Sequence, residues 1–155
     1  MNTAEEIEKI YVKPHTKVSR EVAPYDMKRV LEDAPRLLLL CMLPRGVHKG
    51  GYAVAHPQID DKDPLRFFVT ATNEVIINPK IIKHTSFGLL KQEGCLSYPD
   101  VPKVSVERFY RITCEYRTIA NKGLSEIKTV DLKGLPAQIW QHEIDHLDAK
   151  YVIPV

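Results

Sequence analysis

The residues with the clearest capacity for chemistry stand at positions 141–146, where the sequence reads QHEIDH. On a helix, His142 and His146 are four positions apart, so both imidazoles project from one face and can bind one metal ion. Glu143 follows the first histidine, where it can accept and return a proton of a water molecule at that ion. A solvated polar helix face would carry the same residue types, so the hypothesis of a metal site needs support from elsewhere in the chain.

A catalytic metal site needs a third protein ligand and one open position. The extended zinc-protease pattern would place a glycine and a histidine seven and ten residues after His142, where this sequence has Ala149 and Val152. Because only nine residues follow His146 (155 minus 146), we expect the third ligand to lie upstream. The best candidate is Cys95, within the sequence EGCLS, since the preceding glycine permits close backbone approach and polar residues flank the thiol.

The two remaining cysteines, Cys41 and Cys114, have no such surroundings and are interpreted as small buried apolar residues. Three cysteines without CxxC spacing argue against a disulfide framework. We therefore expect the protein in the cytoplasm or an equivalent reducing compartment.

The stretches EGCLS at 93–97 and QHEIDHL at 141–147 resemble the second and third signature motifs of the peptide deformylase family. The stretch GYAVAHPQ at 51–58 resembles the first motif, and all three occur in the family's order. In that first motif Ala53, Val54 and His56 replace a glycine, a leucine and an alanine of the family pattern.

Two further departures concern the end of the chain. Ala149 stands where the family usually has glycine. The long C-terminal helix common in bacterial members is not present in the sequence, which therefore resembles the shortened members, including some encoded by viruses of bacteria.

The resemblance implies an activity and a metal. The expected reaction is metal-dependent hydrolysis of the N-formyl group from the formylmethionine of nascent polypeptides, with release of formate. Cys95, His142 and His146 would bind one divalent ion, natively ferrous iron, with zinc, nickel or cobalt as alternatives that the same ligands suit. Glu143 would then be the general acid and base.

The resemblance also implies how the substrate is held. The side-chain amide of Gln58 and the backbone N–H of Leu96 would stabilise the oxyanion formed from the formyl oxygen. Gly51 and Val54 would contact the substrate, with Ile139 and His142 as further walls of a small apolar pocket for the methionine side chain.

Neighbouring residues are expected to support these groups. Asp145 could accept the outer N–H of one metal-bound histidine, or it could be a plain solvated carboxylate. Glu93 could pair with Arg108 and brace the cysteine loop, or Arg108 could be an unrelated surface residue. We expect His56 near the rim of the site, on a strand face shared with Val54 and Gln58, without contact to the metal.

Two other functions compete with this hypothesis. A general metallopeptidase would cleave unblocked peptides, although the Cys95 motif speaks against it. A non-catalytic peptide-binding homologue would explain the altered first motif, although such a binder has no chemical need for the complete set of ligands, Glu143 and Gln58.

Composition limits the partners. The chain has 155 residues with 44% hydrophobic and 27% charged content, which suits one globular domain over residues 1–155. A formal net charge of +2 and a longest apolar run of seven residues, at 37–43, give no reason to expect nucleic acid or membrane as partner. The resemblance to the family, and not composition, implies formylmethionyl peptides and the ribosome exit region as partners, with a monomer as the expected state.

The elements that must position these residues follow from periodicity. The residues from Leu135 to Leu147 are apolar at helical spacing, and strands are indicated at 51–55, 66–70, 75–77, 110–117 and 127–132. Short helices are indicated at 5–12 and 26–32, with breaks at Pro35 and Pro79. The expected fold is α+β, with antiparallel β-sheets packed around a central metal-binding helix.

Overall fold

The computed structural model describes residues 17–42, 51–86, 89–93 and 104–150, without the side chains of 89–93 and 104. Its largest element is an antiparallel sheet in the order β1-β2-β3-β6-β9. The strands of this sheet are β1 (Ala53–Ala55), β2 (Phe67–Thr70), β3 (Val75–His84), β6 (Arg111–Arg117) and β9 (Lys128–Lys133).

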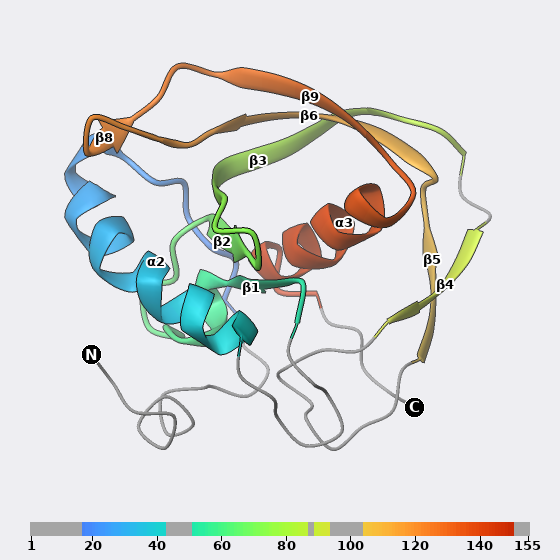
Figure 1. Ribbon diagram of the computed structural model, residues 1–155, viewed down its shortest axis with the longest axis horizontal. Coiled ribbons are helices and arrows are strands. Elements are labelled where there is room, and N and C mark those ends of the chain that lie inside the picture. The colour runs from blue at the N-terminus through green and yellow to red at the C-terminus, as the bar shows by residue number, and fades with distance from the viewer. Residues whose placement is uncertain (1–16, 43–50, 87–88, 94–103, 151–155) are drawn as a thin grey trace.

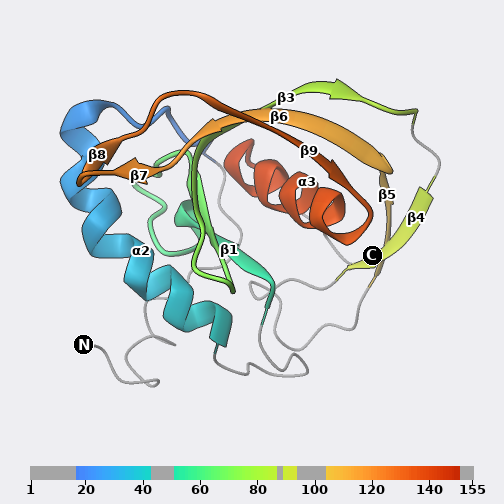
Figure 2. The same ribbon diagram turned by 45° about the horizontal axis from the view of Figure 1, so that its top comes forward.

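Helix α3 (Leu135–Leu147) lies beneath the arch formed by β3, β6 and β9 (Figure 1). The hairpin of β4 (Leu89–Glu93) and β5 (Val104–Arg108) stands at one side of this helix, and α2 (Met27–Met42) lies at the other (Figure 2). The short hairpin of β7 (Ile119–Ala120) and β8 (Gly123–Leu124) lies near the start of α2. The expected α+β fold, with antiparallel sheets around a central helix, is confirmed.

Helix α2 follows the 3-10 turn η1 (Pro24–Asp26) and runs through Pro35, where the sequence predicted a break. Buried residues recur every three or four positions on both sides of the proline: Met27, Val30, Ala34, Leu37, Leu40 and Cys41. Pro35 itself lies on the exposed face. The apolar stripe continues across the proline, and its burial outweighs the loss of one backbone hydrogen bond.

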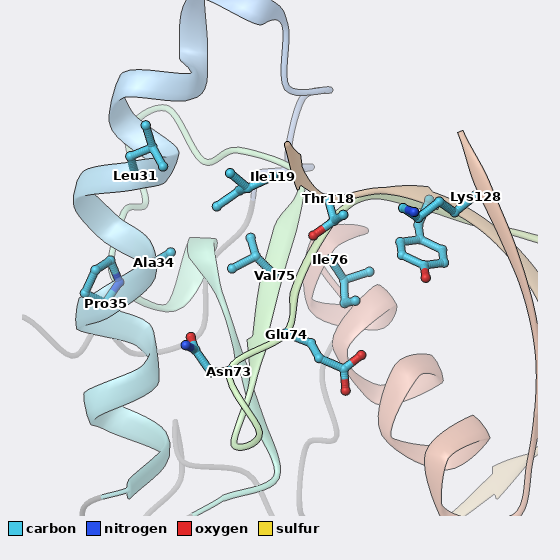
Figure 3. A pocket seen from close by; sticks show the side chains of 11 residues that line it. Leu31, Ala34, Pro35, Asn73, Glu74, Val75, Ile76, Thr118, Ile119 and Lys128 are labelled. Carbon is cyan, nitrogen blue, oxygen red and sulfur yellow. The ribbon is translucent and has the colours of Figure 1, made fainter. Parts of the chain in front are cut away.

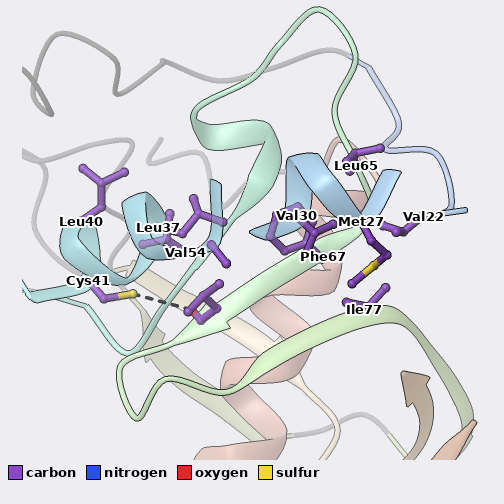
Figure 4. Packing of buried hydrophobic residues seen from close by; sticks show 12 residues of the cluster. Val22, Met27, Val30, Leu37, Leu40, Cys41, Val54, Leu65, Phe67 and Ile77 are labelled. Atoms are coloured by element: carbon purple, nitrogen blue, oxygen red, sulfur yellow. Dashed lines mark hydrogen bonds between the residues drawn. The ribbon is translucent and has the colours of Figure 1, made fainter. Parts of the chain in front are cut away.

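The strands β1, β2 and β3 separate two apolar clusters, because alternate side chains point to opposite faces. Val54, Phe67 and Ile77 pack with α2, as Figure 4 shows. Ala55 and Phe68, one position along, pack in the other cluster with Ala137, Trp140 and Ile144 of α3. The site helix is therefore held against one face of these strands while α2 covers the opposite face.

The predicted break at Pro79 is wrong, as is the one at Pro35. Pro79 was expected to mark a turn, but β3 continues past it to His84, with a shift of register between Ile77 and Lys80 and a left-handed Asn78 (φ 52°). A bulge places the proline where it need not donate to the neighbouring strand. The β4–β5 hairpin was not predicted, and the expected helix at 5–12 lies outside the described residues.

Helix α3 begins and ends where the sequence predicts. Gly134 precedes it with φ 67°, a conformation that favours glycine. At the other end the N–H of Lys150 donates to the Asp145 carbonyl and the N–H of Ala149 donates to the His146 carbonyl. These two bonds form a Schellman motif.

Within the described chain, neither α2 nor α3 is both long and apolar enough to cross a membrane.

Candidate metal centre

Helix α3 brings together two imidazoles and a carboxylate at its buried face. His142, Glu143 and His146 are 9%, 3% and 1% exposed, and their nearest ligand atoms all lie within 4.8 Å of one another. The two Nε2 atoms are 3.2 Å apart. Spacing of four residues on the helix produces this approach, since the imidazoles stand one turn apart on the same side.

The donor set fits a divalent ion. Two nitrogens bound at the usual metal–nitrogen distance and at a tetrahedral angle would be about 3.3 Å apart. The 3.2 Å between the Nε2 atoms matches this separation. A hydrogen bond between one protonated and one unprotonated imidazole also gives such a distance, so the fit rests on the donor types together with the spacing. The predicted ligands His142 and His146 do lie together.

The third predicted ligand, Cys95, and the predicted oxyanion donor Leu96 lie outside the described residues. The other two cysteines are buried in the two apolar clusters, as expected. Burial, and then the negative charge of the nearby Glu143, raises the pKa of the Cys41 thiol well above its ordinary value. Burial raises the pKa of Cys114 to about 12. Both therefore stay protonated thiols near neutral pH, unlike a metal ligand.

Gln58 ends the 3-10 helix η2 (His56–Gln58), which packs against both α2 and α3. Its side chain is 1% exposed, and its Oε1 accepts a hydrogen bond from the Ala55 N–H at 2.9 Å. Because Oε1 accepts this backbone hydrogen bond, the orientation of the amide is fixed and its NH₂ group faces away from Ala55. A rigid amide donor is what the predicted role of Gln58 requires.

The two predicted substrate contacts lie at β1. The N–H of Gly51 donates to the Cys41 carbonyl at 2.9 Å, which joins the start of β1 to the end of α2. Val54 is fully buried in the cluster with α2, on the face of β1 opposite to Ala53 and Ala55. Its side chain thus points away from α3, which differs from the expected pocket wall beside His142. Strand alternation is the reason.

The expectation that His56 lies at the rim is wrong. The strand ends at Ala55 and the chain turns into η2, so His56 does not continue an alternating face with Val54. Its imidazole is 0% exposed, stacks on Phe67 with ring centroids 4.7 Å apart, and hydrogen bonds to Asp33 of α2. This histidine belongs to the packing between η2 and α2.

The expected support for the histidines also differs. Among the described residues, the partner of Asp145 is Arg108 and not a histidine, and its Oδ2 accepts a hydrogen bond of 2.6 Å from the guanidinium. Arg108 is 5% exposed, so it is no unrelated surface residue, and its pairing joins the end of β5 to α3. The side chain of Glu93, its predicted partner, lies outside the described residues.

Sequence reasoning missed the role of Gln141. Its Oε1 accepts the Phe109 N–H at 2.8 Å, while its Nε2 donates to the Phe109 carbonyl and to the Ala137 carbonyl, each at 2.9 Å. The sequence did contain a signal for this role. Gln141 is a polar residue directly before His142, at a helical position that faces the interior. The structure shows that it joins α3 to the β5–β6 connection.

A cavity of about 550 Å³ lies elsewhere, between α2 and the turn that joins β2 to β3 (Figure 3). Leu31 and Pro35 of α2 line one side, and Glu74 and Lys128 contribute the charges. Neither His142 nor His146 lines it. This cavity is separate from the metal centre.

The fold and site define the class as α+β proteins that carry a two-histidine, one-glutamate group on a buried helix. The family model described as polypeptide deformylase matches residues 7–154. The chain belongs to the polypeptide deformylase family.

Individual relatives agree with this assignment. A peptide deformylase of Thermotoga neapolitana is 33% identical over 109 residues, which cover 68% of this chain and 62% of the relative. Peptide deformylase 2 of Geobacillus stearothermophilus is 40% identical over 107 residues, covering 63% and 55%. These alignments thus span less than two thirds of the relatives' own lengths.

Solved structures cover more of the chain. The crystal structure of peptide deformylase from Thermotoga maritima superposes with a TM-score of 0.70 at 30% identity, covering 88% of this chain and 86% of that one. The enzyme of the Vibrio parahaemolyticus bacteriophage VP16T, in complex with actinonin, gives 0.63 at 25% identity, covering 91% and 95%. The resemblance to deformylases from viruses of bacteria is therefore seen in the structure as well.

Proposed function

We propose that this chain hydrolyses the formyl group from the N-terminal formylmethionine of nascent polypeptides and releases formate. Family membership supports the reaction, and the observation that carries the chemistry is the 3.2 Å approach of the His142 and His146 Nε2 atoms beside the Glu143 carboxylate. Cys95, His142 and His146 would hold one divalent metal ion. Such an ion would act as a Lewis acid and would lower the pKa of a bound water molecule.

The protein's own residues would then divide the work. Glu143, buried next to the first ligand, accepts a proton from the attacking water and delivers it to the departing amine nitrogen. Gln58 donates a side-chain N–H to the oxygen of the formyl group as negative charge develops on it, and the backbone N–H of Leu96 is the second donor. Losing one such donor typically costs about 3 kcal/mol of activation free energy.

Ferrous iron is the proposed native metal, with zinc, nickel or cobalt as functional replacements. A thiolate and two imidazoles suit all of these ions, and the resemblance to the family favours iron. We also propose that Gly51 and the backbone of Val54, whose side chain is buried against α2, contact the substrate. The protein is further proposed to act as a monomer near the ribosome exit and to reside in a reducing compartment such as the cytoplasm.

The test is an assay of protein purified without oxygen and loaded with ferrous iron. Formyl-Met-Ala-Ser should be hydrolysed to formate and Met-Ala-Ser, while the matched peptide Met-Ala-Ser, supplied alone, should remain intact. Cleavage of the unblocked peptide would instead indicate a metallopeptidase. No reaction with either peptide, despite stoichiometric bound metal, would indicate a non-catalytic homologue.

Cysteine variants test the ligand set. Cys95→Ala should purify without tightly bound metal, because water does not replace the charge and soft donor of a thiolate. Cys114→Ala is the matched control and should retain the metal, since Cys114 is a buried protonated thiol. Stoichiometric metal in Cys95→Ala would exclude this cysteine as a ligand.

A further inference from the structure

Both ring nitrogens of His56 make defined hydrogen bonds, and together they fix its protonation. Nδ1 lies 2.9 Å from the backbone N–H of Leu65, which can only donate, so Nδ1 must be unprotonated. Nε2 therefore carries the proton and donates it to the Asp33 carboxylate at 2.8 Å. The imidazole is a neutral, fully buried bridge between α2 and the loop that follows η2.

A second link joins the same two segments. Arg29, one turn before Asp33 on α2, donates to the Asp60 carboxylate at 2.8 Å. The N–H groups of Ile59 and Asp60 both donate to the His56 carbonyl, at 3.0 and 3.1 Å. The turn that carries Gln58 is thus stabilised by its own backbone hydrogen bonds. It is attached to α2 through His56 at its start and through Asp60 after its end.

The position of η2 gives this attachment a consequence for the site. The turn packs between α2 on one side and α3 on the other, and Gln58 is its last residue. His56 holds the turn from the α2 side, two residues before Gln58. Any shift of η2 away from α2 would move the amide of Gln58 relative to His142 and His146, because Gln58 is fixed to the backbone of Ala55 in the same turn.

We propose that Asp33 and His56 are positioning residues for Gln58. They hold η2 against α2, so that the Gln58 amide keeps the alignment that the developing oxyanion requires. This proposal rests on the proposed function of Gln58. The resembled family pattern has alanine at position 56, so the Asp33–His56 link fixes a part of the first motif that is altered in this chain.

The first experiment compares three variants on formyl-Met-Ala-Ser with iron-loaded protein. Asp33→Ala removes the acceptor of the buried Nε2–H and should lower kcat by about tenfold, with KM unchanged, since misalignment weakens an interaction made in the transition state. Asp33→Asn keeps an acceptor oxygen and should restore most of kcat. Arg36→Ala is the matched control, because it removes the other partner of Asp33, an exposed contact of 3.3 Å, and leaves His56 intact.

The second experiment asks whether the effect passes through Gln58. Gln58→Leu should lower kcat by about a hundredfold, and adding Asp33→Ala to Gln58→Leu should lower it no further. Multiplicative losses in the double variant would overturn the proposal, because Asp33 would then act independently of Gln58. Equal loss in Asp33→Asn and Asp33→Ala would also overturn it.

A third measurement does not depend on activity. Nitrogen-15 spectra of the histidine side chains, recorded on zinc-loaded protein, should show His56 as the neutral tautomer with its proton on Nε2. In Asp33→Ala the His56 signals should shift, whereas in Arg36→Ala they should not. A charged His56, or a proton on Nδ1, would refute the bridge even if the protein proved to have no deformylase activity.

Discussion

The side-chain amide of Gln141 exchanges two hydrogen bonds with the backbone of Phe109, accepting from its N–H at 2.8 Å and donating to its carbonyl at 2.9 Å. The pair reproduces between a helix and a loop the reciprocal pattern that two backbones make in an antiparallel sheet. It fixes α3 directly beside His142.

Gln141→Leu should lower the free energy of unfolding by about 2–3 kcal/mol. The substitution leaves the Phe109 N–H and carbonyl without these bonds at a site where Gln141 is 5% exposed. Urea unfolding measures the change. Glu32→Leu, on the exposed face of α2, is the control and should change stability by less than about 0.5 kcal/mol. Equal effects of the two variants would show that the amide pair contributes nothing specific.

Glu143→Gln should keep the bound metal and lose nearly all turnover. The glutamate is not among the proposed ligands, so removing its charge spares metal binding while it abolishes proton transfer. Metal content and the formyl-peptide rate constant are measured on one preparation. A rate within a few-fold of the unmodified protein would exclude Glu143 as the acid and base.

Ala149→Gly should stabilise the protein by about 1 kcal/mol. Ala149 has φ 58° in the Schellman motif that ends α3, and a left-handed conformation is strained for any residue with a Cβ. Thermal or urea unfolding detects the gain. The matched opposite change, Gly134→Ala, should destabilise the protein, because Gly134 has φ 67° before the same helix. A loss of stability in Ala149→Gly would contradict the strain.

Stability should depend on the Cys114 thiol at high pH. Burial raises the pKa of Cys114 from 9.0 to about 12. The folded chain therefore keeps a proton that the unfolded chain releases. The stabilisation of the folded state by the protonated Cys114 thiol is complete below pH 9.0 and is lost as pH rises through about 12.

Cys114→Ala has no thiol to titrate, so only the unmodified protein loses stability through this group above pH 9.0. The difference in unfolding free energy between the unmodified protein and Cys114→Ala should therefore become smaller, by up to about 1.4 kcal/mol per pH unit. Urea titrations at pH 8, 9 and 10 measure the trend. Thr113→Val, the neighbouring residue on the other face of β6, is the control, and its difference should stay constant. A pH-independent difference for Cys114→Ala would mean that burial does not hold the thiol proton.

The sequence alone determined the site helix. The apolar spacing from Leu135 to Leu147 predicted both of its ends, and the i and i+4 positions of His142 and His146 predicted their approach. These features depend on contacts within one or two helical turns, which local spacing specifies. The expected burial of Cys41 and Cys114 was also right, because a lone cysteine usually behaves as a small apolar residue.

Only the tertiary structure decided what surrounds that helix. His56 meets Asp33 across 23 positions, and Arg108 meets Asp145 across 37. Helix α2 continues through Pro35 because its apolar stripe finds strands to pack against. Residues so far apart in the chain meet because the faces of their helices and strands pack together. Local sequence patterns do not specify which faces pack. The sequence therefore specified the chemical groups, whereas packing between α2, η2 and α3 specified how those groups are held.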